Sequence, residues 1–124
     1  MKTRKLKTLN IKMDDFMSWL NSASRTERKG RVVAGTPRSA AACPVANYLT
    51  DCGIGPAVVS GTRVIIEKDY WAQEKNHVLE ETVVVERYRL PRWAVRFGKE
   101  VDKRNHLISF YLAKQLFNKV TKRP

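Results

Sequence analysis

Four cations in the second half of the chain have the spacing of one helix face. Pro91, just before them, suits the first position of a helix, where its missing N–H has no partner in any case. At 3.6 residues per turn, positions i, i+4, i+7 and i+11 fall on one narrow stripe; here they are Arg92, Arg96, Lys99 and Lys103. Arginine forms bidentate hydrogen bonds with phosphate, and lysine binds phosphate as a point charge. The chemistry that this stripe offers is contact with a phosphate backbone.

Aromatic residues are interleaved with these cations and with two arginines that precede them. Arg87 and Arg89 alternate with Tyr88 and are expected to share one face of a strand. The helical period sends Trp93 and Phe97 away from the cationic stripe, toward a core. Because only exposed rings can stack on unpaired bases, we assign the arginines to phosphate contact and expect no base stacking.

A second candidate region for phosphate contact lies in the first third of the chain. Residues 24–38 hold two glycines, one proline and five cations, which predicts a mobile basic loop. Its expected secondary contacts are Arg28, Lys29 and Arg31. Residues 1–12 are predicted to form a basic arm, either a solvated terminus or a segment that orders on phosphate or on a partner. Residues 122–124 form a short basic tail.

The charge of the whole chain favours an acidic partner. The formal net charge is +12 over 124 residues, and it is uneven: residues 63–86 carry −3 and residues 87–124 carry +9. Such a field attracts polyanions. The leading hypothesis is non-catalytic binding to the backbone of DNA or RNA. The alternative is a protein-interaction module, an adaptor, regulator or inhibitor that docks on an acidic protein, with Trp19 or Tyr70-Trp71 as anchors.

No catalytic or metal-binding pattern is present in the sequence. The two cysteines are nine residues apart and the two histidines twenty-nine apart, unlike the close ligand pairs of a zinc site. We therefore predict no enzyme activity, no metal and no cofactor. One position could be reactive: Cys43 is expected at a helix N-cap, where the dipole can lower the thiol pKa. The favoured interpretation of Cys43 is a small buried or capping residue.

The remaining signals predict a single α+β domain over residues 13–121. Pro44 and Gly53 mark the start and stop of a short helix, Gly61-Thr62 suits a type II′ hairpin turn, and Asn105 is expected to cap the last helix. The fold is predicted as a small three-stranded antiparallel sheet, a hairpin plus one strand, packed by about four helices. The expected helices are 13–23, 44–52, 91–103 and 106–121, and the expected strands are 57–60, 63–67 and 82–90. Residues 69–81 are left without assignment.

The sequence also bears on location. No apolar run approaches the roughly 20 residues that cross a bilayer, and no apolar stretch follows the basic N-terminus as it would in a secretory signal. Two cysteines make no disulfide framework. We expect a cytoplasmic protein without a membrane partner.

Overall fold

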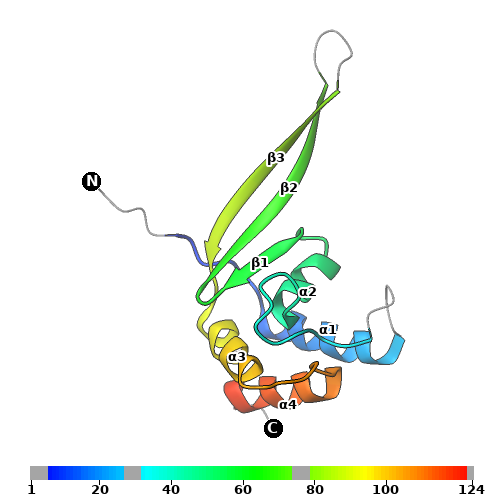
Figure 1. Cartoon of the computed structure of the whole chain (residues 1–124), viewed down its shortest axis with the longest axis vertical. Coiled ribbons are helices and arrows are strands. Elements are labelled where there is room, and N and C mark those ends of the chain that lie inside the picture. The colour runs from blue at the N-terminus through cyan, green and yellow to red at the C-terminus, as the bar shows by residue number, and fades with distance from the viewer. Residues whose placement is uncertain (1–5, 27–31, 74–78, 123–124) are drawn as a thin grey trace, which may run out of the picture.

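The computed structural model describes residues 6–26, 32–73 and 79–122, and over these ranges it confirms the predicted α+β architecture (Figure 1). A three-stranded antiparallel sheet in the order β1-β2-β3 is accompanied by four helices. The elements in chain order are α1 (Met13–Thr26), α2 (Pro44–Asp51), β1 (Ala57–Ser60), β2 (Arg63–Gln73), β3 (Leu79–Arg89), α3 (Arg92–Asp102) and α4 (Phe110–Thr121). The helices gather around the lower part of the sheet, and the hairpin of β2 and β3 extends away from them (Figure 1).

The sheet is longer than the sequence predicts. β1 has its predicted bounds and pairs with β2 around the turn at Gly61 and Thr62. Gly61 has a φ of 59° and Thr62 is not among the residues with positive φ, as the predicted type II′ turn requires. β2 and β3 pair without a break from Arg63 and Arg89 to Gln73 and Leu79. Most of the segment left without assignment is therefore strand.

The core is built around one phenylalanine of α1. Phe16 is fully buried, and its ring lies between 5.2 and 5.7 Å from five other aromatic rings, measured between ring centroids. These rings come from α1, α2, α3 and α4: Trp19, Tyr48, Trp93, Phe97 and Phe117. Val64 and Ile66 contribute the inward face of β2. One aromatic cluster thus joins all four helices.

The helix α2 has the predicted signals at both ends. Cys43 is its N-cap and is followed by Pro44. At the other end, Gly53 has a φ of 78°, the left-handed conformation that favours glycine. The Ile54 amide donates to the Leu49 carbonyl at 3.1 Å, and the Gly53 amide donates to the Thr50 carbonyl at 3.2 Å. These two bonds make a Schellman ending, which agrees with the predicted stop at Gly53.

The prediction of a mobile loop over residues 24–38 is wrong where the structure describes it. Residues 24–26 continue α1. Further on, Ala34 is fully buried, and Gly35 pairs with Ile108 in an antiparallel bridge. The buried Asn47 side chain donates to the carbonyl oxygens of Ala34 and Ala42 at 2.9 and 3.1 Å. A Cβ at Gly35 would lie 2.5 Å from the nitrogen of Pro44, so the segment packs directly on the start of α2.

The same bridge moves the start of the last helix. Asn105 is not its cap: α4 begins at Phe110, and the Ser109 hydroxyl accepts a bond from the Leu112 amide at 3.1 Å. Ile108 exchanges backbone bonds with Ala34 and Gly35. Pairing of this kind needs extended backbone, which delays the helix by several residues.

The N-terminal segment joins the sheet. Thr8 pairs in parallel with Arg89: the Leu9 amide donates to the Arg89 carbonyl, and the Arg89 amide donates to the Lys7 carbonyl, each at 2.8 Å. Ile11 is buried in the core. Residues from Lys7 onward therefore belong to the folded unit. Within the described ranges, no helix has the length and apolar character to cross a membrane.

Candidate nucleic-acid interface

The helix α3 presents the cationic stripe on its exposed face. Arg92, Arg96, Lys99 and Lys103 are all exposed. The opposite face is buried through Ala94, Phe97 and Val101. The helix therefore has the two-sided character that the spacing predicts, with Pro91 as N-cap rather than as the first helical residue.

The aromatic residues of this helix face inward. Trp93 is half-buried, its ring packs against the rings of Phe16 and Phe117, and its indole N–H donates to the Ile11 carbonyl at 3.4 Å. Phe97 is fully buried. Neither ring is placed to stack on a base, so the surface of α3 offers charge alone.

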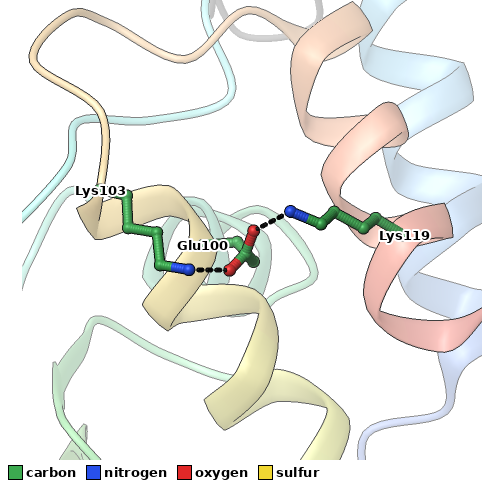
Figure 2. A network of polar contacts seen from close by, with 3 residues as sticks. All are labelled: Glu100, Lys103 and Lys119. Atoms are coloured by element: carbon green, nitrogen blue, oxygen red, sulfur yellow. Dashed lines mark hydrogen bonds and ion pairs between the residues drawn. The ribbon is translucent and has the colours of Figure 1, made fainter.

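One member of the stripe, the C-cap residue Lys103, is bound by an acid of α3 (Figure 2). The Lys103 ammonium lies 2.6 Å from one carboxylate oxygen of Glu100, and Lys119 of α4 lies 2.7 Å from the other. Hydrogen bonds from Lys103 and from Lys119, in that order, lower the pKa of Glu100 to about 2. The Glu100 side chain is 12% exposed, against 67% for Lys103. Lys103 is therefore the stripe residue least available to a ligand.

The other three cations of the stripe have no such partner. Across the described residues, no hydrogen bond or ion pair engages the side chain of Arg92, Arg96 or Lys99. Arg92 is also the first helical residue, and the first turn of α3 contains no acid. A cation at the positive end of a helix dipole is unfavourable. The stability of the helix does not explain this arrangement of charge.

A second group of cations lies on the outer face of the sheet. Arg87 and Arg89 are exposed, whereas Leu90 is buried, in line with the predicted alternation. Arg63 of β2 is exposed as well, and it is the register partner of Arg89. The sequence interpretation omitted Arg63. The two-residue turn fixes its position in β2, but its neighbour on β3 depends on a register that the sequence did not reveal.

The structure describes only part of the basic segment that was predicted to make secondary phosphate contacts. Arg28, Lys29 and Arg31 lie outside the described residues. Arg38, from the same predicted loop, is structural: its guanidinium donates to the carbonyl oxygens of Asp102 and Arg104, and its amide donates to the Asp102 carboxylate. Its φ of 55° is unusual for a side-chain-bearing residue. Arg38 thereby ties the loop to the end of α3.

The proposed reactivity of Cys43 does not find support. Burial raises the pKa of the Cys43 thiol above its usual value, and the backbone N–H groups of Ala46 and Val45 offset only part of this effect. Cys43 lines a groove of about 250 Å³ whose walls also include Val59, Leu90 and Lys99. A protonated thiol in this mostly apolar setting is a packing residue. Among the described residues, no three His, Cys, Asp or Glu side chains are grouped so that they could hold a metal ion.

Comparison of the chain with protein-family models, with curated proteins and with solved structures finds no match.

Proposed function

We propose that this protein binds the phosphate backbone of DNA or RNA and does no chemistry on it. The observation that carries the proposal is the exposed face of α3, where Arg92, Arg96 and Lys99 have no counter-charge within the described part of the chain. A phosphate backbone would supply that charge. The net charge of +12 would add long-range attraction.

The inward orientation of the aromatic rings bears on how nucleic acid would be recognised. Phosphate contacts fix position and give affinity, but they carry no sequence information directly. We therefore expect strong salt dependence and little sequence preference. A cytoplasmic setting is part of this proposal, and the thiol state of Cys43 and Cys52 suits a reducing compartment.

The test is fluorescence anisotropy with generic single- and double-stranded DNA and RNA. The double variant Arg92→Glu/Arg96→Glu reverses the charge of two of the three unpaired cations on α3 and should abolish binding at low salt. The matched control is Lys114→Glu/Lys122→Glu, which changes the net charge equally but places the change on and just after α4. If the two double variants bind equally well, general charge rather than the α3 face attracts the ligand. If the wild-type chain binds none of the four nucleic acids, the proposal is wrong.

A second candidate is docking on an acidic protein, and exposed apolar residues favour it. Trp19 is not a free anchor, because its indole N–H donates to Asp51 at 3.0 Å and its ring packs against Tyr48 and Phe110. The side chains of Tyr70 and Trp71 are outside those described. Instead, Tyr111 is 69% exposed and Leu107 is 58% exposed, at and just before the start of α4. A protein partner whose binding survives 300 mM salt and is lost in Tyr111→Ala would favour this candidate.

A further inference from the structure

Two arginines face each other directly across the outer face of the sheet. Arg63 of β2 and Arg89 of β3 are register partners. The N–H and C=O groups of Arg89 bond to Lys7 and Leu9 on the opposite side of β3, and the Leu90 amide donates to the Thr62 carbonyl. Arg63 and Arg89 therefore form a non-hydrogen-bonded pair, the type in which the Cα atoms are only about 4.5 Å apart and side chains are closest.

A third arginine, Arg87, lies two residues before Arg89 on β3 and diagonally across from Arg63 of β2. Arg87 shares the face, because its register partner is Ile65, two residues beyond Arg63. All three arginines are exposed, and Ile65 is half-buried between their positions. The other neighbour of Arg63, on β1, is Ser60, which is neutral.

This arrangement is unfavourable unless something compensates it. Like charges directly opposite each other in a sheet are destabilising. The nearest acid on this face of β2 is Glu67, whose register partner is Val85, and no described residue forms an ion pair with any of the three arginines. The sheet face therefore keeps three unneutralised guanidinium groups together.

We infer that Arg63 and Arg89 hold one phosphate group between them, with Arg87 as a flanking contact. Two guanidinium groups on one rigid sheet face can each present a pair of N–H donors to the same group, and such bidentate pairs are the strongest phosphate contacts. As the source of the phosphate we name a nucleic-acid backbone, and that part of the inference rests on the proposed function. The chemistry alone would also admit a small phosphorylated molecule.

The first arm of the test uses inorganic phosphate and thermal unfolding. Phosphate is compared with chloride at equal ionic strength, so that general screening cancels. Wild-type protein should gain about 5 °C in Tm at a tenfold excess of phosphate over its Kd. Arg63→Gln should have a higher Tm than wild type without phosphate, because the repulsion is relieved, and should lose the phosphate-dependent gain. Arg89→Gln should behave in the same way.

Two further variants separate a phosphate clamp from general charge. Arg63→Lys keeps the repulsion but loses the bidentate geometry, so it should lose most of the phosphate gain without the rise in Tm. Lys114→Gln removes a cation from α4, away from both cationic surfaces, and should keep the full phosphate-dependent rise in Tm. The inference is overturned if phosphate does not raise the Tm of wild type above its value in chloride, or if Arg63→Gln retains this rise.

The second arm identifies the source of the phosphate. Oligonucleotide binding of Arg63→Gln is compared with wild type by anisotropy at low salt. Weaker binding by the variant assigns the clamp to the nucleic-acid backbone. If oligonucleotide binding is unchanged and the phosphate-dependent rise in Tm is lost, the clamp binds a small phosphorylated molecule, and the assignment to a nucleic-acid backbone is overturned. A wild-type chain that gains stability from phosphate but binds no oligonucleotide overturns the proposed function and leaves the clamp intact.

Discussion

The stripe on α3 makes a quantitative prediction about salt dependence. Arg92 and Lys99 are seven residues apart, which at 1.5 Å per residue is about 10 Å along the helix axis. This distance matches about three base-pair steps of 3.4 Å, measured along the axis of a duplex. With Arg96 between them, the stripe can neutralise three phosphates and contributes a slope of about −2.7 to log K against log salt on duplex DNA.

Two lysines of the same stripe should differ sharply when each is changed to glutamine. Lys99 has no partner within the described ranges, so Lys99→Gln should reduce the slope by about 0.9. Glu100 already neutralises Lys103, so Lys103→Gln should leave the slope almost unchanged. Over a rise from 50 to 300 mM salt, the contribution of the stripe falls about 100-fold with three contacts and about 25-fold with two.

The assay is anisotropy on one duplex at five or more salt concentrations, with both variants and wild type measured side by side. Each substitution removes one unit of charge, one in the last turn of α3 and one at its C-cap, so each is the control for the other. Equal losses of slope for Lys99→Gln and Lys103→Gln would refute the reasoning, because they would show that the Glu100 contact does not withdraw Lys103 from the interface.

Four other predictions concern the residues that hold and frame this surface. Glu100→Gln should tighten DNA binding at low salt, because it releases two lysines. The pKa of Glu100 is lowered from 4.5 to about 2, so its stabilising effect is present above pH 4.5 and is lost toward pH 2. The difference in Tm between wild type and this variant should therefore disappear as the pH falls through that interval. Phe16→Ala should lower the free energy of unfolding by about 3–5 kcal/mol in a urea titration, and a loss below 1 kcal/mol would contradict its central position. Asn47→Ala should cost about 1–3 kcal/mol in the same titration, since the buried Ala34 carbonyl loses the Asn47 donor, whereas the Ala42 carbonyl keeps its bond from the Thr36 amide. With a maleimide at neutral pH, Cys52 should be labelled well before Cys43, because Cys52 is exposed and burial raises the pKa of Cys43; the reverse order would restore the idea of a reactive thiol.

Local signals in the sequence were sufficient where neighbouring residues decide the structure. Pro44 and Gly53 bracket α2 because a helix start and a left-handed ending depend on the backbone within a few residues. Gly61 sets the turn between β1 and β2 in the same way. The cationic stripe followed from helical period alone, and all of its members are exposed.

The errors arise where distant segments meet. Asn105 is a residue type that often caps helices. However, Ile108 pairs with Gly35, more than seventy residues earlier, so the backbone at Ile108 is extended and Ser109 becomes the N-cap. The same pairing fixes a segment whose composition suggests mobility. Lys103 is a different case: Glu100 precedes it by three residues, a spacing that brings side chains together on a helix, so the sequence already allows this ion pair, to which the structure adds Lys119. For Asn105 and for the segment around Gly35, a contact between remote residues outweighs a local preference.

The position of Phe16 at the centre of the aromatic cluster has a consequence for synthesis on the ribosome. Its helix is synthesised before the sheet, whereas three of its ring partners, Trp93, Phe97 and Phe117, belong to the two helices that follow the sheet. The nascent α1 therefore carries its apolar stripe uncovered until some hundred residues have been translated. Contacts of such sequence separation slow folding and leave apolar surface open to aggregation meanwhile. We expect a nascent chain stalled before α3 to engage chaperones, and one that includes α4 to be released from them.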